Sequence, residues 1–439
     1  MKYLIIGNSA AGIGAVEGIR QIDKNGEIIM ITNEPYHTYS RPLISYYLSG
    51  KVTEEKMKYR SDDFYKKHNC NILKNTTVVE IDAKTKQVVL NDGKKISYDK
   101  LLAATGSSAF IPPFEGLDSV KSKHTFTSFD DVKCLDKELD SLENKRVLII
   151  GAGLIGLKCA EGILGRGQIR PSRKPHIASL SSLAVSSYSG DPPCTAQFPK
   201  RSITVLDISP AILSSILDKD GAKKVQNHLE NKRIEFKLSS NIIKFETNTA
   251  VLESGEKIDF DILILAVGVR PNTSLLKGIA EIDKGIIVNE KSETSASDIY
   301  AAGDCTQTID ISDGQNKIMA LLPNAYMQGE CAGINMAGGE KVFDKAIPMN
   351  AISFCGMHMI TAGNYNGDIY EEQTEETYKR LYYSENKLNG YILIGNVDKA
   401  GIYTNLIREQ TPLDSIDFEL ICKKPGLMAF SREHRESVL

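Results

Sequence analysis

The chain has 439 residues, of which 41% are hydrophobic and 25% are charged, a composition typical of a globular protein with two to three domains. The formal net charge is -3, with basic and acidic residues interspersed, which excludes nucleic acid as a first choice of partner. The eight cysteines form no CxxC pair and have no histidine at metal-ligand spacing, so we expect no zinc, iron–sulfur or other metal site.

The N-terminal segment is apolar after Lys2, but Glu17 and Arg20 follow it and no small-residue cleavage site closes it, so we do not expect a signal peptide. No apolar run reaches the roughly 18 residues that a membrane span requires. Scattered cysteines are also typical of a reducing compartment. The sequence therefore predicts a cytoplasmic protein with no membrane segment.

The first predicted element is a strand at residues 2–6, followed by the turn GNSAAG and a helix through residue 19. A strand, a glycine turn and a helix in this order direct the helix N-terminal amides at a pyrophosphate. Gly7 permits the tight turn, and Gly12 lets the helix approach the strand closely. Ser9 stands where the usual fingerprint has its second glycine, and Ala10 and Ala11 follow it. These residues predict a nucleotide-binding turn.

The same construction returns at residues 146–156, RVLIIGAGLIG, after a strongly apolar strand. Here Gly151, Gly153 and Gly156 satisfy the glycine fingerprint in full, and Ile155 lies within the turn. Two such turns in one chain predict two bound dinucleotides. A hydride then has both a donor and an acceptor.

An acidic residue ends the strand that follows each turn. Glu34 lies 22 residues beyond Gly12, after a strand at residues 27–31, and Asp207 ends the strand SITVLD. A carboxylate at this place can accept hydrogen bonds from an adenosine ribose. No lysine or arginine comes directly after Asp207 to bind a 2'-phosphate, so we expect NADH rather than NADPH.

Four further segments resemble parts of the pyridine nucleotide-disulfide oxidoreductase superfamily of flavoproteins: LLAATGSSAFIPP, ILAVGVRPN, IYAAGDC and the helix ALLPNAYMQGECAGINMAG. This resemblance covers nearly the whole chain. It implies that FAD binds at the first turn and NAD(H) at the second, with Asp304 on the ribityl chain of FAD. The further cofactor contacts that it implies are Val79, Thr105, Gly106, Gly268, Pro323 and Asn324.

The fold class that we expect is α/β, with two Rossmann-like dinucleotide-binding domains, for FAD and NAD, and a small C-terminal α+β interface domain. The FAD-binding domain comprises residues 1–110 and 271–322, and the NAD(H)-binding domain, residues 111–270, is inserted between its two parts. The interface domain comprises residues 323–439, and in many relatives it forms a homodimer. The resemblance therefore leaves both a homodimer and a monomer open for this chain.

The segment YSRPLISYYLSG, residues 39–50, sets this chain apart from the thiol-using branches. Disulfide-reducing members carry a CxxxxC pair, and the branch with peroxidases and NADH oxidases carries a single cysteine about where Pro42 stands here. Cys70 is the nearest cysteine in sequence, but it has no adjacent base and we expect it to be incidental. The Ser-Arg-Pro sequence resembles rubredoxin reductases, ferredoxin reductases and the flavin module of nitrite reductases.

Two basic residues, Arg41 and Lys158, lie in or next to these motifs. Arg41 either positions flavin or nicotinamide phosphate, and thereby contributes to cofactor binding with Pro42, or anchors its loop. Lys158 stands where many relatives have glutamate, and we expect a plain lysine on the helix surface.

An insertion interrupts the second nucleotide-binding region. Gly156 and Asp207 are 51 residues apart, whereas Gly12 and Glu34 are 22 apart, and the excess lies within residues 166–202, a stretch rich in proline and serine. We expect a disordered or foreign insertion rather than a basic partner-docking loop. If it displaces the end of the preceding helix, NADH affinity falls.

Together these features predict an NADH-dependent FAD oxidoreductase that passes electrons from the flavin to a small electron-carrier protein, with rubredoxin as the first candidate. No side chain acts as nucleophile, since flavin N5 accepts the hydride, and positioning supplies most of what the protein contributes. The alternatives are an NADH oxidase, a flavin module that serves nitrite reduction, and a non-enzymatic flavin-binding protein whose NAD site the insertion has impaired.

Overall fold

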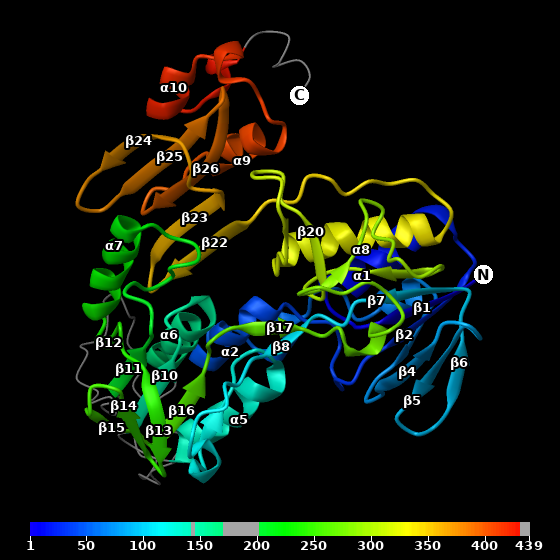
Figure 1. The fold of residues 1–439 in the computed structure, drawn as a ribbon, viewed down its shortest axis with the longest axis horizontal. Coiled ribbons are helices and arrows are strands. Elements are labelled where there is room, and N and C mark those ends of the chain that lie inside the picture. The colour runs from blue at the N-terminus through cyan, green and yellow to red at the C-terminus, as the bar shows by residue number, and fades with distance from the viewer. Residues whose placement is uncertain (142–144, 170–201, 431–439) are drawn as a thin grey trace, which may run out of the picture.

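Two parallel sheets and one antiparallel sheet organise the chain in the computed structural model, which describes residues 1–141, 145–169 and 202–430 (Figure 1). Among these residues, no helix combines the length and the apolar character needed to cross a membrane. The α/β fold class is confirmed. The domain limits given above stay a prediction.

The first sheet contains five parallel strands in the order β19-β7-β1-β2-β3. Their bounds are β1 (Lys2–Ile6), β2 (Glu27–Ile31), β3 (Cys70–Leu73), β7 (Lys100–Ala103) and β19 (Ile299–Ala301). All the residues of β1 after Lys2 are buried, as a central parallel strand requires. Strand β19 joins this sheet from far along the chain, after the second sheet is complete.

Helices α1 (Ala10–Ile22) and α8 (Leu322–Met336) lie side by side against the first sheet (Figure 1). Glycines let their backbones touch: a Cβ atom added at Gly329 would lie 2.0 Å from the carbonyl oxygen of Ala11, and one added at Gly14 would lie 2.4 Å from that of Tyr326. This contact fixes the N-terminus of α8 relative to the first glycine turn. A small antiparallel sheet, β4 (Val78–Asp82), β5 (Gln87–Leu90) and β6 (Lys95–Ser97), follows β3.

The second sheet repeats the parallel arrangement, in the order β12-β11-β10-β16-β9. Its strands are β9 (Lys123–His124), β10 (Arg146–Ile150), β11 (Ser202–Leu206), β12 (Ile234–Lys237) and β16 (Ile262–Leu265). The helices of this region are α5 (Phe129–Ser141), α6 (Leu154–Ile169) and α7 (Lys219–Glu230). An antiparallel sheet of β13 (Ile242–Glu246), β14 (Thr249–Leu252) and β15 (Lys257–Asp259) completes it.

A two-stranded antiparallel ribbon, β8 (Ser107–Ala109) and β17 (Val269–Pro271), joins the two parallel sheets (Figure 1). At its end, Thr105 Oγ1 donates to the carbonyl oxygen of Asn272 at 2.7 Å, and Asn272 Nδ2 donates to that of Thr105 at 2.9 Å. These reciprocal bonds hold together the two segments in which the chain passes between the parallel sheets. Of the segments that follow, β18 (Ile286–Ile287), β20 (Thr306–Ile309) and β21 (Asn316–Lys317) form a third small sheet.

The C-terminal region is an antiparallel sheet in the order β22-β23-β26-β25-β24. Its strands are β22 (Met349–Phe354), β23 (Met357–Gly363), β24 (Asp368–Gln373), β25 (Tyr378–Ser384) and β26 (Lys387–Ile394). Buried side chains of this sheet pack on α9 (Ala400–Arg408) and α10 (Phe418–Lys423) on one face, and join the core of the second region on the other. Strand β22 thereby reaches α6, next to the site described below.

Candidate functional site

Both glycine turns line one continuous cavity of about 1580 Å³. The short helices η1 (Arg41–Leu43) and α2 (Ile44–Ser49), strand β22 and the N-terminus of α8 also border it. Of the residues predicted to bind cofactor, those that line the cavity are Gly7, Ser9, Ala10, Ala11, Glu34, Arg41, Pro42, Thr105, Gly106, Gly151, Gly153, Ile155, Asp207, Gly268, Asp304 and Pro323. A single cavity of this kind can bring two extended cofactors together.

The first turn leaves β1 with a backbone conformation that favours glycine. Gly7 has φ +120°, and a Cβ atom added to it would lie 2.1 Å from the carbonyl oxygen of Ala104. A Cβ atom at Gly12 would lie 2.1 Å from the carbonyl oxygen of Gly7. The Ser9 side chain makes no capping hydrogen bond to α1, so the helix N-terminus stays open towards the cavity.

The second turn leaves β10 in nearly the same way. Gly151 has φ +111°, and its added Cβ atom would lie 2.2 Å from the carbonyl oxygen of Ala266. A Cβ atom at Gly156 would meet the carbonyl oxygen of Gly151 at 2.0 Å, whereas one at Gly153 would meet nothing within 4 Å. Gly153 therefore leaves open space on the cavity side, where a phosphate group can approach the backbone.

Asp207 is fixed by main-chain amides at the end of β11. Its carboxylate accepts hydrogen bonds from the amide of Ala152 at 2.6 Å and from that of Ser209 at 2.8 Å. These bonds connect the acid directly to the second glycine turn. The arrangement leaves the carboxylate on the cavity wall, where it can also accept from hydroxyl groups.

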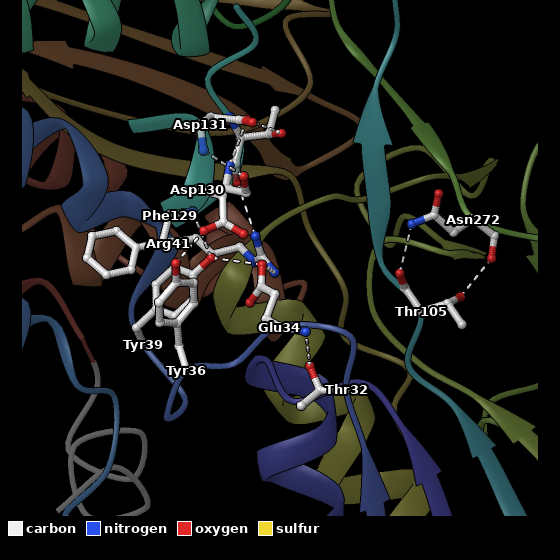
Figure 2. A network of polar contacts seen from close by, with 12 residues as sticks. Thr32, Glu34, Tyr36, Tyr39, Arg41, Thr105, Phe129, Asp130, Asp131 and Asn272 are labelled. Carbon is white, nitrogen blue, oxygen red and sulfur yellow. Dashed lines mark hydrogen bonds and ion pairs between the residues drawn. The ribbon is translucent and has the colours of Figure 1, made fainter. Parts of the chain in front are cut away.

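Glu34 is held by side chains instead (Figure 2). Its Oε1 accepts from Arg41 Nη2 at 3.0 Å and from the Tyr39 hydroxyl at 3.1 Å. Arg41 Nη1 also donates to the carbonyl oxygen of Thr127 at 3.1 Å, just before α5. Arg41 thus anchors its loop to both the first and the second region, as one of the two sequence interpretations expected. Its predicted contact with a cofactor phosphate stays a prediction.

Asp304 lies beside the connecting ribbon. Its Oδ2 accepts from the Ser107 hydroxyl at 3.0 Å, and burial raises the pKa of its carboxyl. The oxygens of a carboxyl group can accept hydrogen bonds from the hydroxyl groups of a sugar-alcohol chain. The structure therefore provides the chemistry that a ribityl contact needs.

Four of the predicted cofactor residues do not line the cavity. Gly12 and Gly156 lie behind their turns, where they provide the close helix–strand approach. The prediction of direct contact does not match the places of the other two. Val79 is 54% exposed on β4, away from the cavity, and the Asn324 amide donates to the carbonyl oxygen of Ile347 at 3.1 Å inside the protein.

Lys158 differs from the sequence expectation of a plain surface lysine. Its side chain is only 14% exposed, it pairs with Glu161, and it lines the cavity. The pattern held a usable signal, because Lys158 lies four residues after Leu154 and so shares the helix face of the second turn. Tyr46, in the segment YSRPLISYYLSG, also lines the cavity. Thr127 and Ser353 line it too, but their chain segments carry no motif that would have revealed it.

The cavity wall offers no thiol among the described residues. No described cysteine lines the cavity, whereas Pro42 lines it. Cys70 lies at the start of β3, where burial raises the pKa of its thiol to about 12. It is therefore not a reactive thiolate, in agreement with the expectation from sequence.

The expected insertion falls mainly on residues 170–201, outside the described residues. Helix α6, with 16 residues, begins at Leu154 and continues through Ile169, well beyond Gly156. The turn and the helix that would hold the second pyrophosphate are both present. The effect of the insertion on the helix end, and through it on NADH affinity, stays a prediction.

Comparison with known proteins agrees with a site for two dinucleotide cofactors. The family described as Pyridine nucleotide-disulphide oxidoreductase matches residues 1–329. The chain is 28% identical to the NADH-dependent phenylglyoxylate dehydrogenase subunit epsilon of Aromatoleum evansii, over 94% of this chain and 92% of that protein. It is 34% identical to an NADH oxidase of Methanocaldococcus jannaschii, over 78% and 71% of the two chains.

Among solved structures, NADH:rubredoxin oxidoreductase from Clostridium acetobutylicum matches with a TM-score of 0.71 and 26% identity. The match covers 94% of this chain and 95% of that chain. The likeness extends through all three sheet regions and is not confined to the nucleotide-binding turns.

Proposed function

Because the chain belongs to the pyridine nucleotide-disulphide oxidoreductase family and is an NADH-dependent FAD oxidoreductase, we propose that its electron acceptor is a small electron-carrier protein, with rubredoxin as the first candidate. FAD, when bound, accepts a hydride from NADH and can release the two electrons one at a time. Family membership also favours an enzyme over the alternative of a non-enzymatic flavin-binding protein.

The observation that carries this proposal is that no cysteine among the described residues lines the cavity. Enzymes that reduce disulfides or peroxides through protein sulfur need a cysteine beside the flavin, and Pro42 takes that part of the wall here. Without an intermediate store on the protein, the electrons leave directly from the flavin. A one-electron carrier protein is suited to receive them.

In this proposal each cofactor is held by its own turn. The amides after Gly7 face the pyrophosphate of FAD, Glu34 its adenosine ribose and Asp304 its ribityl chain. The amides after Gly151 face the pyrophosphate of NADH, and Asp207 its ribose. The chain contributes by binding and orienting the two reactants in near-attack geometry and by limiting the access of water.

An anaerobic titration tests the absence of a thiol store. We expect one equivalent of NADH per bound flavin to bleach the yellow absorbance completely, because the flavin is the only group that takes up electrons. A requirement for two equivalents would contradict the proposal, since a second redox group would then be present.

NADH oxidase activity is the second candidate, and the 34% identity to an NADH oxidase favours it. The two functions differ in whether oxygen or a protein reoxidises the flavin fastest. Service as the flavin module of a nitrite reductase would need a partner that supplies the siroheme and iron–sulfur centres. A homodimer stays a prediction.

A further inference from the structure

Lys158 meets three parts of the chain at the wall of the cavity. Its Nζ donates to the carbonyl oxygen of Ser353 on β22 at 3.1 Å, and it lies 4.7 Å from the ring centroid of Tyr46 on α2. Its own helix, α6, begins at the second glycine turn. The ammonium group therefore stands where the two nucleotide-binding regions and the C-terminal sheet come together.

The carboxylate partner of Lys158 lies behind it. Glu161 pairs with Lys158 through Oε2, and its Oε1 accepts from the amide of Cys355 at 2.9 Å. Glu161 is buried and, unlike Lys158, does not line the cavity. The pair therefore presents its positive end to the cavity and its negative end to the protein interior.

The other two cations on the described cavity wall have different partners. Arg41 pairs with Glu34, which lines the cavity itself, so both charges of that pair face the cofactor space. Lys317 pairs with two carboxylates, those of Asp310 and Asp313, so its positive charge is offset twice. Lys158 instead pairs with Glu161, which does not line the cavity, so the positive end of this pair is the end nearer to the cavity.

We propose that Lys158 is a positioning residue that favours the reduced flavin electrostatically, and that Glu161 holds it in place and limits its effect. The inference rests on the proposed function, since it requires flavin in this cavity. Acceptance of a hydride adds one negative charge to the flavin ring, and a nearby cation stabilises the more negative form. NADH and FAD must meet within the cavity that both turns line, and Lys158 lies on the wall of this cavity.

A purely structural role for Lys158 makes a different prediction. As a brace between α6, α2 and β22, it would affect flavin only by loosening the fold, and removal of either charge of the pair would then act in the same direction. An electrostatic role predicts that removal of the two charges shifts the flavin potential in opposite directions. Lys158→Gln removes the positive end that faces the cavity, and Glu161→Gln removes the negative end that offsets it.

The test is the midpoint potential of the bound flavin, measured in the purified holoprotein by equilibration with a reference dye under chemical reduction. No NADH and no protein acceptor take part. We expect Lys158→Gln to lower the potential and Glu161→Gln to raise it, each by about a tenfold change in the reduction equilibrium, or about 30 mV for a two-electron couple. The double variant should lie between the two.

The chain offers a matched control in Lys51, which lies 5.5 Å from the centroid of the same Tyr46 ring but is exposed and does not line the cavity. Lys51→Gln should leave the potential unchanged, and Lys158→Arg should retain most of the parent value. Melting temperatures of all variants separate electrostatics from loss of folding.

Equal potentials in Lys158→Gln and the parent, or shifts of the same sign in Lys158→Gln and Glu161→Gln, would overturn the inference. If Lys158→Gln does not fold, the predicted rise in Glu161→Gln decides alone, and its absence overturns the inference. The flavin content of the parent protein separates failure of the proposed function from failure of this inference. A parent protein without bound flavin contradicts the proposed function. A parent protein that binds flavin, but whose variants have the same flavin potential as the parent, contradicts only the role of Lys158.

Discussion

The two glycine turns have the same backbone geometry. In each, the first glycine has a positive φ, donates its amide to the end of the neighbouring strand, and faces a strand carbonyl too close for a side chain. These bonds run from Gly7 to Ile31 at 2.9 Å and from Gly151 to Leu206 at 2.8 Å. The agreement shows that the backbone geometry is set by the strand–turn–helix unit and hardly depends on the residues between the glycines.

The acids that follow the turns differ in how they are fixed. Asp207 is held by main-chain amides of its own region, whereas Glu34 is held by Arg41 and Tyr39, and Arg41 reaches across to Thr127 before α5. The contacts that fix the acid of the second site therefore come from its own region. The first site depends on a contact between the two regions, so changes there should affect both flavin retention and the junction.

The largest expected effect separates the two turns. In Gly7→Ala, the positive φ and the contact with Ala104 should prevent the turn from forming, and the purified protein should lack flavin. In Gly151→Ala, flavin should stay bound and be reduced by dithionite, while NADH reduces it at least about 100-fold more slowly. Flavin content and anaerobic reduction rates measure both effects. Equal flavin loss in the two variants would contradict the assignment of one cofactor to each turn.

A smaller effect is expected at the acids. Asp207→Asn should weaken NADH binding about tenfold or more, since a hydrogen bond to a charged group contributes about 1.5–3 kcal/mol. Its flavin content should stay normal. Glu34→Gln is the counterpart: it should lower flavin retention and leave the NADH affinity of the flavin-loaded fraction unchanged. The dissociation constants for the two cofactors give the measurement, and a reversed pattern would refute the assignment.

The middle position of each turn allows a finer test. Gly153→Ser introduces the residue that the first turn has at position 9, and a Cβ atom there meets nothing within 4 Å. The melting temperature should therefore stay close to that of the parent. The KM for NADH should rise several-fold, because the side chain enters the space left for the pyrophosphate. A destabilised protein with unchanged KM would show that Gly153 serves folding instead.

The smallest effect is expected at Pro42. Pro42→Cys alone should not give disulfide or peroxide reductase activity, because a thiol also needs neighbouring groups that lower its pKa. Turnover with a disulfide and with hydrogen peroxide should stay at the background of the parent. A clear gain of either activity would show that the cavity already contains such groups.

Much of the fold could be predicted because the two turns and the strands around them are local patterns. The glycines fix the backbone, and the buried parallel strands are continuous apolar runs, so both are readable from the sequence. The three sheet regions followed from the resemblance of the later segments to a known family. The family match over residues 1–329 covers the first two of these regions, and the likeness to the solved NADH:rubredoxin oxidoreductase covers 94% of the chain.

The parts that could not be predicted depend on contacts between distant segments. The helix face of Lys158 could be inferred from its spacing to Leu154, but its burial depends on contacts with β22 and α2. The hydrogen bond between Arg41 and Thr127 likewise joins two segments that are far apart in the sequence. Val79 was carried over from the family pattern, but the exposure of its side chain depends on how the β4–β6 sheet packs. Such contacts leave no local signal in one sequence.

The most direct test of the central claim compares acceptors for the reduced flavin. Protein reduced with one equivalent of NADH without oxygen should be mixed with oxidised rubredoxin, oxygen or nitrite, and the return of the yellow absorbance followed. If rubredoxin is the electron acceptor, it should reoxidise the flavin faster than oxygen or nitrite. Reoxidation by oxygen that is as fast as, or faster than, reoxidation by rubredoxin would contradict it and favour an NADH oxidase.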